Sequence, residues 1–330
     1  MIPCYNRATV VAETLQCVLH QSLPPDEIIA VDDGSTDHTI EVLQSLGPRL
    51  RILRQNNAGP GAARNAGLAV ASGEFVWFMD SDDLASLNKL EVQVRALEQS
   101  EADVALCPWV KCRLDGSNAY AETHVLQQKG LPQQMARVLV SRWTVVLQSA
   151  LFRRSLLTKA GPFDPSYSVA EDQLFFLKCL LTGARAVHTP DCLVLYRTDG
   201  ANKLTDKGCA TERRFVDWAR FLLEARRLCL EAGMPDPAGY FSFRLRLWCA
   251  QRDLLGCSSD KAREIVALLG DVLGDRKMSS ACALAQKGAQ YVGGIRQRVF
   301  GDRSPWALRA GPLQPGQKAL IAELGYSFNA

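Results

Sequence analysis

Three carboxylates fall within four residues at the end of the apolar run 75–79, in the order Asp80, Ser81, Asp82 and Asp83. Such a cluster repels itself, so a fold tolerates it only where positive charge compensates. An apolar strand that runs directly into the cluster places it at the carboxyl end of a sheet strand. Open α/β sheets form their ligand crevice there. A divalent metal ion is one suitable compensator, because carboxylate oxygens are hard ligands.

A second acidic pair, Asp32 and Asp33, follows the apolar segment 28–31. A solvated acidic turn would explain either cluster alone. Two clusters at the ends of two strands instead predict a combined metal and nucleotide site.

Short strand patterns alternate with helical patterns over the first part of the chain, which is typical of a largely parallel sheet covered by helices. Less regular patterns at 109–114 and 145–152 predict hairpins or antiparallel edge strands. Apolar residues at helical spacing predict a helix that begins at Glu171. The expected strands are 28–31, 51–53, 75–79 and 104–107.

The character of the sequence changes after about residue 204, where helical spacing dominates and strand patterns are scarce. We therefore predict an α/β domain over residues 1–204 and a mostly helical C-terminal extension over 205–330. The stretch from about 302 contains several prolines and glycines, and we expect it to be a poorly ordered tail.

The composition is that of an ordinary globular protein, with 330 residues, 47% hydrophobic and 22% charged. No apolar run approaches the ~20 residues of a membrane span, and no signal peptide opens the chain. The 11 cysteines include no C-x-x-C pair, so we expect reduced, buried thiols rather than a zinc site or a disulfide framework.

Charge is divided unevenly, with −4 over residues 1–200 and +7 over residues 201–330. The basic part is either an ordinary solvated helical surface or a face for an anionic partner. We expect a cytoplasmic protein whose basic helices make peripheral contact with the inner membrane face. The candidate contacts are Arg213, Arg214, Arg220, Arg226 and Arg227. No dense stripe of basic and aromatic residues predicts nucleic-acid binding.

The sequence lacks the common motifs of other nucleotide-binding proteins and of hydrolases. Gly59 and Gly61 begin a G-x-G-x-x-G pattern, but Arg64 occupies the place of the third glycine. No G-x-x-x-x-G-K-[ST] loop and no G-x-S-x-G elbow are present, and the four histidines are better explained as structural residues.

Seven short motifs together resemble glycosyltransferase family 2 in their order and spacing, over about residues 1–200. They are IPCYN (2–6), VDDGSTD (31–37), NAGPGAARN (57–65), FMDSDD (78–83), GPFD (161–164), ED (171–172) and LYR (195–197). The resemblance implies a GT-A fold and transfer of a sugar from a nucleotide donor with inversion of the anomeric centre.

The resemblance also implies roles for individual residues. Asp82 is the principal metal ligand and Asp80 lies toward the ribose or the metal. Asp33 accepts an N–H of the base, and Tyr5 stacks on it, a combination that selects uracil. Arg64 either places positive charge near the donor or pairs with Asp32 or Asp33. The implied donor-binding residues are Pro3, Tyr5, Asn6, Asp32, Asp33, Arg64, Asp80 and Ser81.

An acceptor hydroxyl is a poor nucleophile at neutral pH, so inversion needs a carboxylate that takes its proton. Asp172 matches the base position of the family, and Glu171 orients it or holds the acceptor. From the residues alone, this acidic pair is explained equally well as a helix cap that the helix dipole stabilises.

Two features depart from the family pattern. Many relatives have a histidine metal ligand two residues after the Tyr-Arg pair, and Asp199 stands there in this chain. An all-oxygen shell of Asp80, Asp82 and Asp199 would favour Mg²⁺ or Mn²⁺. The segment before Pro3 is also short, so we expect the first strand to be nearly absent.

The sequence therefore predicts a metal-dependent inverting glycosyltransferase with a nucleotide-sugar donor, most readily UDP-linked, and a glycan or lipid-linked acceptor. Cell-surface polysaccharide or glycoconjugate synthesis would be the setting. Two alternatives remain. A non-catalytic nucleotide-sugar-binding or scaffold protein would bind donor without turnover, and a sugar nucleotidyltransferase would need a glycine-rich basic loop near residue 3.

Overall fold

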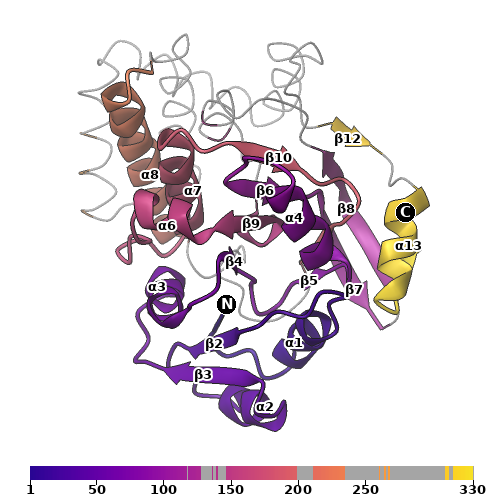
Figure 1. Cartoon of the computed structure of the whole chain (residues 1–330). Coiled ribbons are helices and arrows are strands. Elements are labelled where there is room, and N and C mark those ends of the chain that lie inside the picture. Colours follow the sequence, from indigo (N-terminus) through magenta and orange to yellow (C-terminus); the bar gives the residue numbers. More distant parts are fainter. Residues whose placement is uncertain are drawn as a thin grey trace, which may run out of the picture.

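The computed structural model of the chain is an α/β fold, and its described residues form three β-sheets flanked by helices (Figure 1). The α/β class predicted from the sequence is confirmed. The structure describes residues 1–116, 118–127, 136, 139, 146–198, 211–234, 260, 264, 267, 309–311 and 315–329.

The first sheet is parallel and consists of β1 (Ile2–Cys4), β2 (Ile28–Asp32) and β3 (Leu50–Arg54). Every residue of β2 is buried, which suits its apolar and β-branched composition. The first strand is three residues long, so it is short but present.

Strand β1 also connects the first sheet to the second. The Met1 ammonium group donates to the Trp77 carbonyl at 2.8 Å, and the Met79 amide donates to the Met1 carbonyl at 2.9 Å. These bonds bring the carboxyl ends of β2 and of β4 (Phe75–Trp77) to the same region, so that the two acidic clusters lie near one another.

The second sheet has the order β10-β6-β9-β4, where β6 is Val104–Leu106, β9 is Ala150–Arg153 and β10 is Ala186–His188. Strand β9 is antiparallel to both neighbours, whereas β10 and β6 are parallel. The antiparallel strand predicted near 145–152 is therefore present, but it is central rather than at an edge. Its four residues are mostly buried, as an interior position requires.

The third sheet contains the hairpin of β7 (Trp109–Asp115) and β8 (Asn118–Gln127), and β7 also pairs in parallel with β11 (Val194–Arg197). Strand β5 (Leu84–Ala85) completes one side of this sheet. On the other side, β12 (Arg309–Gly311) and β13 (Ser327–Asn329) both pair with β8.

The helices follow the apolar spacing of the sequence closely. The predicted helix that starts at Glu171 is α7, and the extension contributes α8, which packs against it (Figure 1). The helices whose bounds fall within the described residues are α1 (Val11–Leu19), α2 (Thr39–Ser45), α3 (Pro60–Val70), α4 (Lys89–Glu98), α6 (Arg154–Ala160), α7 (Glu171–Leu181), α8 (Thr211–Glu231) and α13 (Pro315–Glu323), with a 3-10 turn at Leu147–Ser149.

An aromatic cluster fills the core directly beneath the first acidic loop. Phe78 makes edge contacts with Phe152, Phe163 and Phe175 at centroid distances of 5.8, 5.2 and 5.8 Å. Phe163 and Phe175 stack at 3.8 Å. Because Phe78 precedes Asp80 and Phe175 follows Asp172, this packing sets the relative position of the acidic loop and the start of α7.

Part of the stretch from about residue 302, for which we predicted a poorly ordered tail, forms regular structure, whereas residues 302–308 and 312–314 lie outside the described residues. Residues 315–329 form α13 and β13, and Gln317, Ile321 and Tyr326 are buried. Local composition missed this because β8, which lies 209 residues earlier in the chain, supplies the pairing partner of β13. The seven cysteines among the described residues are buried and form no disulfide, as expected for the buried thiols predicted from the sequence.

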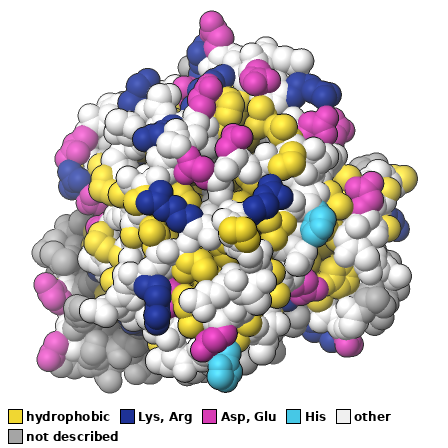
Figure 2. Space-filling model, turned by 60° about the horizontal axis from the view of Figure 1, so that its bottom comes forward, with side chains coloured by type: hydrophobic (Ala, Val, Ile, Leu, Met, Phe, Trp, Pro, Cys, Tyr) yellow, Lys and Arg dark blue, Asp and Glu magenta, His cyan; other side chains and the backbone are white. Residues whose placement is uncertain are grey.

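Charges of both signs are interspersed with apolar side chains on the face that Figure 2 shows, where side chains are described. On that face no single sign of charge dominates, so it offers no broad field that would steer an ionic ligand.

Candidate active site

The acidic loop after β4 keeps its carboxylates apart by giving each one different partners. Asp80 accepts from the Arg64 guanidinium at 2.7 Å, and Asp82 lies 3.8 Å from Nε of Arg7. The Asp83 carboxylate is buried and accepts the backbone N–H of Arg197 at 2.8 Å. Cationic side chains thus face the first two carboxylates, while a backbone donor fixes the third.

Asp83 connects the acidic loop to three other parts of the fold. Its side chain accepts from Arg197 N–H in β11 and from the Gln148 amide in the 3-10 turn, and its carbonyl accepts from the Thr14 hydroxyl of α1 at 2.9 Å. Such charge-assisted bonds to a buried carboxylate are strong. They anchor one end of the loop that carries Asp80 and Asp82.

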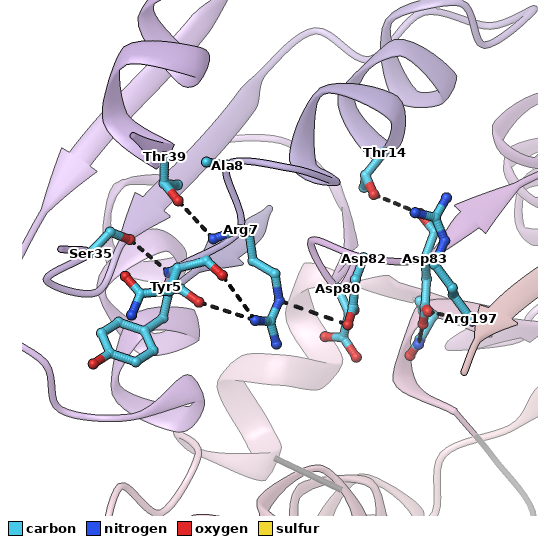
Figure 3. A network of polar contacts seen from close by, with 12 residues as sticks. Tyr5, Arg7, Ala8, Thr14, Ser35, Thr39, Asp80, Asp82, Asp83 and Arg197 are labelled. Atoms are coloured by element: carbon cyan, nitrogen blue, oxygen red, sulfur yellow. Dashed lines mark hydrogen bonds and ion pairs between the residues drawn. The ribbon is translucent and has the colours of Figure 1, made fainter. Parts of the chain in front are cut away.

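The loop after β1 lies beside the acidic loop, with Arg7 between Tyr5 and Asp82 (Figure 3). Nη1 of Arg7 donates to the carbonyls of Tyr5 and Asn6 at 3.4 and 3.1 Å. Tyr5 is 43% exposed, so a planar ligand has access to its side chain. Sequence reasoning assigned no role to Arg7, although it directly follows the IPCYN motif.

Asn6 ties this loop to the one after β2. Its side-chain carbonyl accepts from the Thr36 amide at 2.8 Å, and its own amide donates to the Ser35 hydroxyl at 3.0 Å. Asn6 has φ of 52°, a left-handed conformation that asparagine tolerates better than most residues. These contacts hold the two loops together. The contact of Asn6 with a nucleotide-sugar donor stays a prediction.

Asp33 is buried and holds the turn that precedes α3. Its carboxylate accepts from the Gln55 side chain at 2.7 Å and from the amides of Ala58 and Gly59 at 2.9 and 2.8 Å. A carboxylate has about four acceptor positions, so one remains for a further donor. Gly34 is required beside it, because its φ is +76° and a Cβ would lie 2.8 Å from the Asn57 amide.

Asp32 is also buried, but unlike Asp33 it has one carboxylate oxygen that accepts no hydrogen bond. Oδ1 accepts from the Ser35 amide at 3.3 Å, whereas Oδ2 has no hydrogen bond and lies 3.5 Å from Nε of Arg54. A buried carboxylate oxygen without a hydrogen bond favours an external donor at that position.

Arg64 joins the two halves of the candidate site. Its guanidinium donates to Asp80 and to Glu171, each at 2.7 Å, and it is buried. The sequence left open a pairing with Asp32 or Asp33, and the structure shows Asp80 and Glu171 as its partners instead. Although burial alone lowers it, the carboxylates of Asp80 and Glu171 hold the pKa of Arg64 above its usual value. Two residues 91 positions apart in sequence are thereby fixed to one side chain.

Asp172 lies at the start of α7, next to this bridge. Its Oδ1 accepts from the Gln173 amide at 2.8 Å, and its surface is partly exposed. Burial and the neighbouring Glu171 carboxylate raise the pKa of Asp172 to about 7. Burial also raises the pKa of Glu171, against the opposing effect of Arg64. The two acids therefore differ, since Glu171 is ion-paired and Asp172 faces partly outward.

The structure gathers most of the residues predicted for the site around Arg64 and Arg7. Pro3 is partly buried in β1, and Ser81 is buried within the acidic loop. Asp199, the third predicted metal ligand, lies outside the described residues. Among the described residues, no three His, Cys, Asp or Glu side chains form a group that could hold a metal ion.

Asn65 is a second residue to which sequence reasoning gave no role. Its side-chain amide donates to the Phe163 carbonyl at 2.9 Å and its oxygen accepts the Phe163 amide at 2.9 Å. This two-point contact fastens the GPFD loop to α3. Only tertiary structure could show it, because 98 residues separate the partners.

Residues 1–161 match the family described as glycosyl transferase family 2. An uncharacterized glycosyltransferase of Escherichia coli, YibD, is 31% identical over 241 residues, which cover 69% of this chain and 70% of that protein. The chain belongs to glycosyltransferase family 2. The resemblance inferred from the seven motifs is confirmed.

Other relatives are matched over smaller shares of their length. EpsJ of Bacillus subtilis, also an uncharacterized glycosyltransferase, is 28% identical over 62% of this chain and 62% of its own length. The poly(ribitol-phosphate) beta-N-acetylglucosaminyltransferase TarS of Staphylococcus aureus is 30% identical over 60% of this chain and 35% of its own length. The chain thus spans between about a third and three-fifths of these relatives.

The fold is that of a solved structure as well. The structure of S. aureus TarS 1–349 in complex with UDP-GlcNAc superposes with a TM-score of 0.63 at 19% identity, covering 90% of both chains. The GT-A fold predicted from the sequence is therefore confirmed. Within the described residues, none of the helices has both the length and the apolar character needed to cross a membrane.

Proposed function

We propose that this protein is a metal-dependent, inverting glycosyltransferase that moves a sugar from a UDP-linked donor to a hydroxyl group of a glycan or lipid-linked acceptor. The observation that carries the proposal is the Arg64 bridge, with 2.7 Å to Asp80 and 2.7 Å to Glu171. It holds the acidic loop beside Asp172. Inverting transfer needs carboxylates at these two places, one group for the departing diphosphate and one for the acceptor proton.

The donor end of the site is assigned to the loops after β1 and β2. The exposed face of Tyr5 offers a stacking surface for a base, and Asp33 retains acceptor capacity for an N–H of uracil. TarS, a relative with the same fold, was solved with UDP-GlcNAc, which supports a UDP-linked donor. The name of TarS describes transfer to poly(ribitol phosphate), which supports an acceptor in cell-surface polysaccharide or glycoconjugate synthesis.

Asp80 and Asp82 would hold the divalent metal. Mg²⁺ is commonly bound by one or two carboxylates together with substrate phosphates, and these two side chains on one short loop fit that donor set. An arginine lies beside each of the two carboxylates, so both already have a positive charge as neighbour. When bound, Mg²⁺ or Mn²⁺ supplies positive charge to the diphosphate as a Lewis acid. Asp199 remains a third proposed ligand.

Asp172 is the proposed base. The acceptor oxygen forms its bond to the anomeric carbon while the bond from that carbon to the diphosphate oxygen breaks. The hydroxyl proton passes to the Asp172 carboxylate, and the nucleoside diphosphate leaves with the electron pair on the opposite face. A base with a pKa of about 7 is well matched to this step near neutral pH. Arg64 opposes the effect of burial on the pKa of Glu171, and the ion pair between the two orients the start of α7.

The test is release of nucleoside diphosphate from UDP-GlcNAc, UDP-glucose, UDP-galactose and GDP-mannose with Mn²⁺ or Mg²⁺, water acting as acceptor. Wild type is compared with Asp82→Asn, with Asp172→Asn, and with Asp26→Asn as a control, because Asp26 is an exposed acid outside the site. We expect slow hydrolysis of one UDP-sugar that chelation abolishes and that falls at least about 100-fold in both site variants.

Two other results would contradict the proposal. Metal-dependent donor binding by calorimetry without any turnover, even with added glycan acceptors, would favour a binding or scaffold protein. Equal turnover in wild type and Asp172→Asn would remove Asp172 as the base.

We also propose that the protein works in the cytoplasm, with α8 against the inner membrane face. Two of the predicted arginines are already engaged, since Arg220 contacts Ser166 and Arg227 pairs with Glu224 and Glu231. Arg213 is exposed and is the best remaining contact. Arg213→Glu should reduce recovery on vesicles rich in anionic lipid, while Arg227→Gln should not. Equal recovery of all three proteins would reject the contact.

A further inference from the structure

The loop that delivers Asp172 to the site has a strained backbone. Ala170, directly before α7, has φ of 68° and ψ of 6°, which is the left-handed helical region. Residues with a Cβ disfavour that region, so surrounding contacts must impose it. Ala170 is buried and forms no side-chain cap. Contacts of the residues that precede it supply part of this constraint.

Those preceding residues are held by one buried carboxylate from the extension. Asp217 of α8 is 3% exposed, and its Oδ2 accepts the backbone N–H groups of Ser168 and Val169 at 2.8 and 3.2 Å. Hydrogen bonds between an ionised carboxylate and buried N–H groups are among the stronger ones in proteins. They fix two consecutive peptide units immediately before the strained residue.

Arg220, one turn further along α8, grips the beginning of the same loop. Its guanidinium donates to the Ser166 hydroxyl at 2.8 Å and to the Ser166 carbonyl at 3.2 Å, and it lies 4.2 Å above the Tyr167 ring. It is also 3.5 Å from Oδ1 of Asp217, so the buried carboxylate has a nearby cation. Together the two side chains contact every residue from 166 to 169.

We propose that Asp217 is a positioning residue for Asp172, through which α8 fixes the direction of the carboxylate that takes the acceptor proton. This inference rests on the proposed function, in which Asp172 is the base. Asp217 lies beyond residues 1–161, the part that matches the family, and belongs to the segment that the sequence described only as a helical extension. The extension is thus part of the catalytic apparatus.

Three variants on α8 separate positioning from simple stability. Asp217→Ala removes the acceptor of both N–H groups. Asp217→Asn keeps one carbonyl oxygen that can accept them, so it is the conservative rescue. Arg227→Ala is the matched control, because Arg227 is an exposed residue whose ion pairs are with Glu224 and Glu231 on the same helix.

The experiment measures metal-dependent hydrolysis of the preferred donor, its pH profile, and donor affinity by calorimetry at a temperature where all variants are folded. For Asp217→Ala we expect kcat to fall about 10- to 100-fold, since small misplacements of a catalytic group have effects of this size. Donor affinity should stay within about twofold, because the hydrogen bonds and the ion pair of Asp217 are with Ser168, Val169 and Arg220. Asp217→Asn should recover most of kcat.

The pH profile gives a readout that loss of stability would not produce. The groups that face Asp172 are Glu171 and Gln173 of α7, Arg64 of α3 and Asp80 of the acidic loop. If the loop relaxes and Asp172 moves toward water, the rising limb of kcat should shift to lower pH. The limb should stay in place for Arg227→Ala.

Each negative result has a separate meaning. An active wild type whose kcat and pH profile are unchanged in Asp217→Ala would overturn the inference and leave the proposed function intact. The same holds if kcat and donor affinity fall together. A wild type that turns over no donor would overturn the proposed function and remove the base that Asp217 is inferred to position.

Discussion

At the scale of single residues, the site is organised by the different partners of similar acids. Asp83 is bound by a backbone donor, whereas Asp80 and Asp82 face arginine side chains. A guanidinium can be replaced at a carboxylate by another cation, but a buried backbone N–H must keep its acceptor. This distinction assigns Asp83 to loop structure and leaves Asp80 and Asp82 for ligands.

Asp172 allows a test in which activity and stability change in opposite directions. Its pKa is raised to about 7, so folding favours the protonated acid. The associated stabilisation is fully present below the unfolded pKa, about 4, and is lost as pH rises through about 7. Asp172→Asn should therefore abolish turnover but raise the unfolding midpoint at pH 8 by about 2–4 °C, the effect of about 1 kcal/mol in a domain of this size.

Near pH 4 and below, the difference in unfolding midpoint should become small, because wild-type Asp172 is then largely protonated in both the folded and the unfolded chain and resembles asparagine in both. Differential scanning calorimetry at both pH values makes the comparison. A stability difference of the same size at pH 4 and pH 8 would show that the acid is not titrating in this range.

Arg64 can be tested by a double-mutant cycle with Glu171. Removing one partner of a buried ion pair leaves an uncompensated charge, so Arg64→Met should destabilise the fold by about 3–5 kcal/mol. The double variant Arg64→Met with Glu171→Gln should recover much of that loss, since no buried charge is left unpaired. Turnover should stay low in both. Urea titration gives the stabilities, and a double variant no more stable than Arg64→Met would argue against the pairing.

At the scale of elements, the contact between α3 and the GPFD loop holds the two halves of the site together. Asn65 makes hydrogen bonds to both the carbonyl and the amide of Phe163, whose ring stacks on Phe175 of α7. Asn65→Ala should cost about 1–3 kcal/mol, because a buried donor or acceptor loses its partner. Kcat should fall with it, since α3 carries Arg64 and α7 carries Asp172.

Asn65→Asp is the sharper variant. It still accepts from the Phe163 amide but places a carboxylate against the Phe163 carbonyl, which has no proton to give. It should be no more stable than Asn65→Ala despite its similar shape. Thermal unfolding decides the point, and a stability equal to wild type would mean that the second hydrogen bond contributes nothing.

The sequence predicted these elements well and their partners poorly. Strands β2 and β4 and the start of α7 follow from local apolar spacing and from the acids that end or begin each element. The antiparallel placement of β9 inside a sheet does not, because a short buried run looks the same in either direction. The partners of Arg64 lie 16 and 107 residues away, so only tertiary packing selects them over Asp32 and Asp33.

At the scale of the whole molecule, the C-terminal segment covers one edge of β8, the edge that faces away from β7. Strand β13 pairs with the start of β8 and β12 pairs with its end, so both cover the edge that the hairpin leaves open. The Tyr326 hydroxyl donates to Glu13 of α1, and Glu13 pairs with Arg197, whose amide binds Asp83. The last residues of the chain are thereby linked to the acidic loop.

Deleting residues 309–330 should have two separable effects. Uncovered β8 would expose unpaired backbone groups, so the deletion should associate in a concentration-dependent way and unfold at lower temperature. Tyr326→Phe keeps the strands and removes only the hydroxyl, so it should elute like wild type in gel filtration. The variant loses the hydrogen bond to Glu13 and so weakens the chain of contacts that leads to Asp83. We therefore expect its affinity for Mn²⁺ and donor, measured by calorimetry, to be about 3- to 10-fold lower than that of wild type, equivalent to about 1 kcal/mol. If Tyr326→Phe binds with wild-type affinity, the segment has no effect on the acidic loop. If the deletion is as stable as wild type, the segment does not stabilise the sheet by covering β8.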